Sequence, residues 1–265
     1  MFKTRLRSSI ILMALTILVI ILGGNVLFGA LLVISLVGIS ELYKILKIEK
    51  TVLGLIGYLA TIAYYGLVLF ELDDYLMLLF IGFLLLLMVT YVVTYPNYRF
   101  EQVMTAFFGL FYVSIMLSYI YQVAILEDGA ILVWLIFIGS WGSDTCAYCV
   151  GILFGKHKII PKLSPKKSLE GCIGGVIGAA LIGFLYALAL GNRITGIDNP
   201  KLLFTIIGAS ASIISQIGDW AASAIKRNFD IKDYGKLIPG HGGILDRFDS
   251  VIFTAPIVYY LAVLF

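Results

Sequence analysis

The feature that most constrains this chain is a series of apolar runs, most of them about 20 residues long, separated by short polar segments. A helical run of about 20 apolar residues is long enough to cross a hydrocarbon core of about 30 Å. Only 13% of the residues are charged, against about 25% in soluble domains. We therefore expect an all-α polytopic membrane protein with about nine transmembrane helices. They are expected over residues 9–22, 26–45, 52–70, 75–93, 103–124, 130–152, 172–190, 202–226 and 249–265, and the first of these is short for a full span.

The basic residues predict an orientation in the membrane. With nine spans, 17 of the 19 Lys and Arg residues fall in segments on the same side, and only Arg193 and Lys201 fall on the other. Cytoplasmic segments of membrane proteins are enriched in Lys and Arg. The N-terminus is therefore expected in the cytoplasm and the C-terminus outside.

The two halves of the chain differ in what they offer chemically. Residues 1–125 are expected to form scaffold helices, and Glu41 near the end of the second run is interpreted as an interfacial salt-bridge partner of Lys44. Residues 126–265 carry carboxylates within apolar runs and two basic cytoplasmic loops, over 154–171 and 226–248. We therefore expect the catalytic part in the C-terminal half.

Carboxylates at membrane depth indicate a metal site. Asp144 lies in the sixth run and Asp219 in the eighth, and a charge at such depth costs a few kcal/mol unless it is paired. Asp246 and Asp249, spaced i and i+3, open the ninth run and can add further oxygens. Such hard ligands favour Mg²⁺. A single Asp–Lys pair between helices is the alternative for Asp144.

The basic segments predict contacts with phosphate. Lys166, Lys167 and Ser168 directly precede the seventh run, where a helix N-terminus favours an anion. A basic patch that attracts anionic lipid is the alternative there. In the stretch 223–249, Gly242 and Gly243 can bring backbone N–H groups to a phosphate and Arg247 can bind one bidentately. Further positive charge comes from Lys226, Arg227, Lys232 and Lys236.

At these residues the sequence resembles the phosphatidate cytidylyltransferase family. The family signature is matched at Ser223, Lys226, Arg227, Lys232, Asp233, Gly235, Ile238, Pro239, His241, Gly242, Gly243, Asp246, Arg247 and Asp249. Two further elements, Trp141 to Tyr148 and Ser164 to Gly171, are similar to the family as well. The resemblance implies a reaction of CTP with phosphatidate that gives CDP-diacylglycerol and pyrophosphate. It also implies Mg²⁺, with K⁺ as a second ion, and a homodimer in the bacterial inner membrane with its active site facing the cytosol, with no nucleic acid as partner.

The resemblance also implies roles for individual residues. The expected catalytic residues are Asp219, Asp246, Lys226, Arg247 and His241. The expected substrate-binding residues are Lys166, Lys167, Ser168, Ser223, Arg227, Lys232, Lys236, Gly242 and Gly243. The expected metal ligands are Asp219, Asp246, Asp249 and Asp144.

Two other functions fit parts of the pattern. A CTP-dependent polyprenol or lipid kinase uses similar acidic and basic elements at a membrane, although the complete signature argues against it. A secondary transporter of an anionic substrate would explain intramembrane Asp residues. Transporters usually show an internal repeat, and residues 1–125 contain no copy of the Asp-bearing half.

Overall fold

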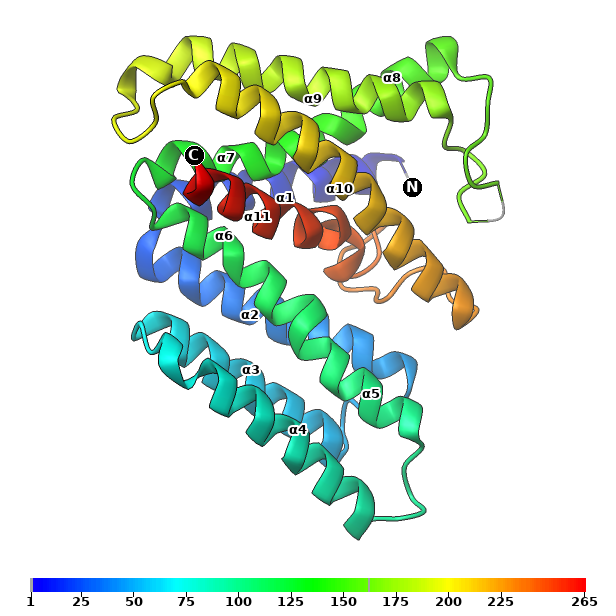
Figure 1. Ribbon diagram of the computed structural model, residues 1–265. Helices are drawn as coiled ribbons and strands as arrows, with labels where there is room; N and C mark the ends of the chain where they lie inside the picture. The colour runs from blue at the N-terminus through cyan, green and yellow to red at the C-terminus, as the bar shows by residue number, and fades with distance from the viewer. Residues whose placement is uncertain (1, 162) are drawn as a thin grey trace. The chain divides into compact units, whose positions relative to one another are not determined.

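The computed structural model describes residues 2–161 and 163–265, without the side chains of residues 2–6. Lys162 of the predicted basic loop therefore lies outside the described residues. The described chain is helical and contains no named strand (Figure 1). Its α-helices are α1 (Phe2–Leu22), α2 (Gly24–Ile45), α3 (Val52–Leu69), α4 (Leu76–Val93), α5 (Phe100–Gly109), α6 (Met116–Ala124), α7 (Gly129–Phe137), α8 (Ser143–Phe154), α9 (Leu169–Leu190), α10 (Pro200–Asn228) and α11 (Leu245–Leu264).

The predicted all-α membrane fold is confirmed. Among the described residues, eight helical segments are long and apolar enough to cross a membrane. They are Gly24–Ile45, Val52–Leu69, Asp73–Val93, Phe100–Ala124, Gly129–Phe154, Leu169–Arg193, Pro200–Asn228 and Leu245–Leu264. The apolar part of α1, Arg7–Leu22, is shorter, and it corresponds to the run that the sequence showed to be the shortest. The orientation of the termini stays a prediction.

Two of the spans are widened locally by a π-helical turn. The segment Leu110–Ile115 joins α5 to α6, and the segment Ile138–Gly142 joins α7 to α8. Short π segments within α-helices are frequent at functional sites. The second one ends two residues before Asp144, the predicted metal ligand on α8.

The described chain divides into two compact units. The first consists of Met1–Leu15, Asn25–Ser118 and Asp233–Arg247, and the second of Thr16–Gly24, Tyr119–Lys232 and Phe248–Phe265. The loop Asp233–Arg247, which carries most of the family signature, thus packs with helices of the first half of the chain. The boundary that the sequence suggested between residues 125 and 126 stays a prediction about function.

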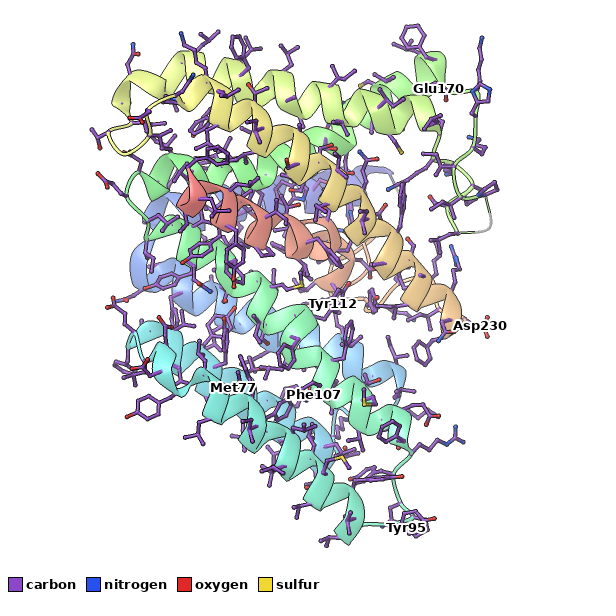
Figure 2. The ribbon with its side chains drawn as sticks, viewed as in Figure 1. Met77, Tyr95, Phe107, Tyr112, Glu170 and Asp230 are labelled. Atoms are coloured by element: carbon purple, nitrogen blue, oxygen red, sulfur yellow. The ribbon has the colours of Figure 1, made fainter. Side chains whose placement is uncertain are left out.

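The first unit has a core of buried aromatic side chains. Tyr43 on α2 is fully buried, and its hydroxyl donates a hydrogen bond of 2.7 Å to the carbonyl oxygen of Ala106 on α5. The rings of Phe83 on α4 and Phe107 on α5, the latter labelled in Figure 2, stack at a centroid distance of 5.8 Å. These contacts join the apolar faces of neighbouring helices and give the buried Tyr43 hydroxyl a partner.

The second unit is built around close contact of α9 with α8 and α10 (Figure 1). A Cβ atom on Gly183 of α9 would collide with the carbonyl oxygen of Phe204, and one on Gly208 of α10 would lie 2.5 Å from the carbonyl oxygen of Ala179. The glycine-rich run of α9 therefore serves helix packing. The hydroxyl oxygens of Ser143 on α8 and Ser212 on α10 lie 2.6 Å apart, so α8 and α10 are also joined directly.

Candidate active site

Three predicted carboxylates share one region of the second unit. Asp144 lies on α8, Asp219 on α10 and Asp249 on α11. Asp249 interacts electrostatically with Asp219, with Lys226 and with Asp144. A Cβ atom on Gly218 would lie 2.8 Å from the carbonyl oxygen of Asp249, so α10 and α11 approach each other closely beside Asp219. Three helices thus bring three of the four predicted metal ligands within electrostatic range.

Lys167 forms an ion pair with Asp219 in this region. Its Nζ donates to Oδ2 of Asp219, and each of the two side chains is only about a quarter exposed, at 27% and 28%. The ammonium group also lies 5.7 Å from the centre of the Trp220 ring, within the range of cation–π attraction. The Asp–Lys pairing that the sequence offered as an alternative for Asp144 is therefore present at Asp219.

Within the part of the chain that the structure describes, no group of three or more His, Cys, Asp or Glu side chains is arranged to hold a metal ion. The predicted metal site of Asp144, Asp219, Asp246 and Asp249 accordingly stays a prediction. The chemistry of the second-unit carboxylates fits a hard cation, because Asp219 already binds a positive group and the charges of Asp144 and Asp249 lie nearby.

The basic loop before α9 is anchored by Ser168. This residue is buried, and its Oγ accepts a hydrogen bond of 3.2 Å from the backbone N–H of Gly171, as an N-cap does. Lys166 is exposed. In the first turn of α9, Glu170 (labelled in Figure 2) accepts hydrogen bonds from the backbone N–H groups of Lys156 and His157 and contacts the His157 ring. The Ser168 hydroxyl therefore serves the helix end in this structure, and its predicted contact with substrate stays a prediction.

The signature loop in the first unit closes on itself in a tight turn. The N–H of Ile238 donates to the carbonyl of Gly242 at 2.9 Å, and that of His241 donates to the carbonyl of Ile238 at 2.9 Å. Gly240 and Gly242 have φ angles of 78° and 84°, which L-residues with a Cβ rarely adopt. Gly240 and the signature residue Gly242 are therefore required by the shape of the turn.

Asp246 holds this loop together from the first turn of α11. It is only 6% exposed, and its Oδ2 accepts the backbone N–H groups of Tyr234 at 2.8 Å and of Gly243 at 2.9 Å. The sequence predicted Asp246 as a catalytic residue and metal ligand. The structure adds a positioning role, since one carboxylate oxygen joins the two ends of the loop.

Glu41 is a residue of this loop region whose contact sequence reasoning missed. It lies on α2, is only 2% exposed, and accepts the N–H of Ile244 at Oε1 (3.1 Å) and the N–H of Leu245 at Oε2 (3.0 Å). A Cβ atom on Gly235 or Gly243 would collide with this carboxylate. Its oxygens thus serve the backbone at the start of α11 rather than a surface salt bridge with Lys44. Only its position near the end of an apolar run distinguished it in the sequence.

His241 and Arg247 each have a nitrogen without a hydrogen-bond partner among the described residues. The His241 Nε2 lies 2.9 Å from the Oγ of Ser9 on α1, while its Nδ1 is buried and unpartnered. The Nε of Arg247 is buried and unpartnered as well. Ser8, which sequence reasoning also missed, donates from its Oγ to the carbonyl of Pro239 at 3.0 Å. Unpaired buried polar groups are rare and costly, so these two nitrogens mark the loop as a place where an anion could bind.

The other predicted residues lie along the end of α10 and in the loop that follows. Ser223 stands one turn after Asp219 on α10 and is half-buried, and Lys226 is half-buried and interacts with Asp249. The remaining basic residues predicted to bind substrate are exposed in the structure, namely Arg227, Lys232 and Lys236.

A polytopic helical fold with carboxylates inside its spans and a glycine-rich polar loop defines an integral membrane protein with a polar reaction site. The model of the Cytidylyltransferase family matches residues 3–265, and the chain belongs to this family. Among its relatives, the phosphatidate cytidylyltransferase of Bacillus subtilis (strain 168) is 32% identical over 96% of each chain. That of Staphylococcus haemolyticus is 32% identical over 98% of this chain and 99% of its own. That of Thermotoga maritima is 37% identical over 74% of this chain and 71% of its own.

Proposed function

We propose that this chain makes CDP-diacylglycerol and pyrophosphate from CTP and phosphatidate. The observation that carries the proposal is the family match over residues 3–265, together with relatives of that named activity that align along nearly the full length of the chain. The complete signature loop, with unpartnered nitrogens on His241 and Arg247, supports a site for phosphate groups.

The reaction is a direct displacement at phosphorus. An oxygen of the phosphatidate phosphate attacks the α-phosphorus of CTP, a new P–O bond forms, and the bond to the bridging oxygen breaks to release pyrophosphate. No general base is required, because the second pKa of a phosphate monoester is about 6 and the attacking oxygen is largely ionised at pH 7. Catalysis then depends on positioning and on charge neutralisation.

The chain's own residues divide these tasks. His241 and Arg247 donate hydrogen bonds to the triphosphate from the signature loop, and Lys226 with Arg227 adds positive charge from the end of α10. Lys166 and Lys167 bind the lipid phosphate or the leaving group from the basic loop. Gly242 and Gly243 leave room for the carboxylates of Asp246 and Glu41, which hold the loop in the shape that presents His241 and Arg247 to phosphate. Ser168, Ser223, Lys232 and Lys236 are the further substrate-binding residues of the proposal.

Asp144, Asp219 and Asp249 would hold Mg²⁺, with Asp246 as a further ligand and K⁺ as a second ion. Bound Mg²⁺ neutralises charge on the phosphate oxygens. The support for this assignment is the donor chemistry of three neighbouring carboxylates, one of which already binds an ammonium group.

The setting of the reaction is part of the proposal. Many apolar helices and bacterial relatives make this a multi-pass membrane protein. We infer that it resides in the bacterial inner membrane as a homodimer, with its site and N-terminus facing the cytosol, as the distribution of Lys and Arg predicts. Reporter fusions at both termini and cross-linking in intact membranes test these assignments.

The test of the activity is pyrophosphate release by the purified protein in detergent, given phosphatidate, CTP and Mg²⁺, with Asp219→Asn as the comparison. Release that requires both substrates and is lost in the variant supports the proposal. CDP formed without pyrophosphate would instead identify a lipid kinase, and a folded protein with no turnover would favour the transporter.

A further inference from the structure

Lys167 and Lys166 are adjacent in the basic loop but have different surroundings. Lys167 is about a quarter exposed, binds Oδ2 of Asp219 and lies over the Trp220 ring. Lys166 is exposed, and its side chain forms no ion pair among the described residues. Both were predicted to bind phosphate, yet only Lys167 is engaged by a carboxylate. The two lysines therefore differ in role in this structure: Lys167 binds a carboxylate, whereas Lys166 is open to solvent.

The carboxylates around Asp219 explain why a cation is bound there. Asp249 interacts with the charges of both Asp219 and Asp144. Like charges that share a partly buried region destabilise one another, and a cation between them reduces that repulsion. Lys167 supplies one positive charge directly to Asp219, and Lys226 supplies a second charge near Asp249.

An ammonium group and a divalent cation would compete for Asp219. Mg²⁺ binds carboxylate oxygens at about 2.0–2.1 Å and demands a nearly octahedral shell. An ammonium already bonded to Oδ2 would take up one of those directions and would repel the ion. The two cations are therefore alternative partners of this carboxylate.

We propose that the Lys167 ammonium is a displaceable counter-ion of the carboxylates of Asp144, Asp219 and Asp249. It leaves Asp219 when a divalent cation binds there. The released lysine then becomes available to a phosphate group, so that binding of the metal prepares the basic loop for substrate. The exchange rests on the proposed function only for the identity of that phosphate. Ser168 follows Lys167 directly and is fixed as the N-cap of α9, so the displacement requires movement of the lysine side chain and leaves the helix in place.

The experiment measures acylation of lysine amines by mass spectrometry in the detergent-purified full chain, without CTP or lipid. Mg²⁺ alone is the probe, and NaCl keeps the ionic strength constant. Removing a partly exposed ion pair should raise the labelling rate of Lys167 by about fivefold. Lys166 serves as the internal control, and its labelling should not change with Mg²⁺.

Two variants make the test independent of fold and of turnover. Asp219→Asn keeps the shape of the side chain, and Lys167 should label rapidly in it with or without Mg²⁺. Lys167→Met removes the competitor, so Mg²⁺ should bind several-fold more tightly in a calorimetric titration. Unchanged Lys167 labelling at Mg²⁺ concentrations that saturate the titration would overturn the proposal, as would slow labelling in Asp219→Asn or unaltered Mg²⁺ affinity in Lys167→Met.

The outcome for the exchange is separate from the outcome for the activity. Mg²⁺-dependent exposure of Lys167 in a protein that releases no pyrophosphate would uphold the exchange and refute the proposed reaction. Pyrophosphate release with Lys167 labelling that ignores Mg²⁺ would uphold the reaction and refute the exchange.

Discussion

Replacing Glu41 by Gln tests the role of this residue in holding the signature loop. The carboxylate is 2% exposed and accepts the N–H groups of Ile244 and Leu245 at 3.1 and 3.0 Å. A Gln side chain keeps one acceptor oxygen but turns its NH₂ group toward the other backbone N–H. One hydrogen bond to a charged group is lost, which is worth about 1.5–3 kcal/mol. A negative charge at the N-terminus of α11 is lost as well, at about 0.3–1 kcal/mol.

The expected total for Glu41→Gln is a loss of roughly 2–4 kcal/mol in the free energy of unfolding. For a chain of this size each kcal/mol corresponds to about 2–4 °C, so the Tm in detergent should fall by roughly 4–16 °C. Because the same loop carries His241 and Arg247, the KM for CTP should rise more than kcat falls. Thermal unfolding and steady-state kinetics at varied CTP measure both effects.

The matched control is Glu101→Gln, which changes an exposed Glu at the start of α5 in the same unit. It should lower the free energy of unfolding by only about 0.3–1 kcal/mol, through loss of a first-turn charge, and leave KM unchanged. A Glu41→Gln protein that melts and turns over like the wild type would refute the assignment of Glu41 as a positioning residue. A lower Tm with unchanged kinetics would restrict Glu41 to folding.

Three further outcomes are expected. Gly243→Ala should lower both Tm and activity, because its Cβ would collide with Glu41. A double-mutant cycle in both assays should show a smaller loss in the Glu41→Ala background. Ser168→Ala should lower the free energy of unfolding by about 1 kcal/mol through loss of the N-cap of α9, measurable as a fall of a few degrees in Tm. Chelation of divalent cations should abolish pyrophosphate release, and added Mg²⁺ should restore it; activity that persists in excess chelator would contradict the metal role of Asp219.

The spans and the signature loop could be predicted because each depends on residues that are consecutive in the sequence. Hydropathy depends on local composition, and the eight long spans and the shorter first one follow from it. The turn at Gly240 to Gly242 likewise follows from local residues. Contacts across the fold left no such pattern. Glu41 lies about 200 residues from the N–H groups that it accepts, and Ser9 lies 232 residues from His241.

The pairing of Lys167 with Asp219 shows a second limit of the sequence. The sequence predicted both residues as parts of a site, with phosphate as the partner of Lys167 and a metal ion as the partner of Asp219. Their direct contact depends on how α9 and α10 pack, since Lys167 precedes one helix and Asp219 lies within the other. Charge type alone indicates which groups attract each other, while the packing of the helices decides which of them meet.

The π-helical turn at Ile138–Gly142 has a consequence for how the chain tolerates insertions and deletions. Successive residues of a regular α-helix are about 100° apart around the axis, so one residue more or fewer rotates everything beyond it by that angle. The wide π-helical turn between α7 and α8 accommodates one extra residue, so the residues of α8 keep their directions around the axis. Removing one residue from this turn would therefore convert it to regular α-helix and leave the direction of Asp144 unchanged. Removing one residue from α7 would keep the span apolar, yet it would rotate Asp144 by about a quarter of a revolution relative to the start of α7. Such a deletion in α7 would preserve the reading frame and the hydropathy of the span, but it would change the direction in which the Asp144 carboxylate points.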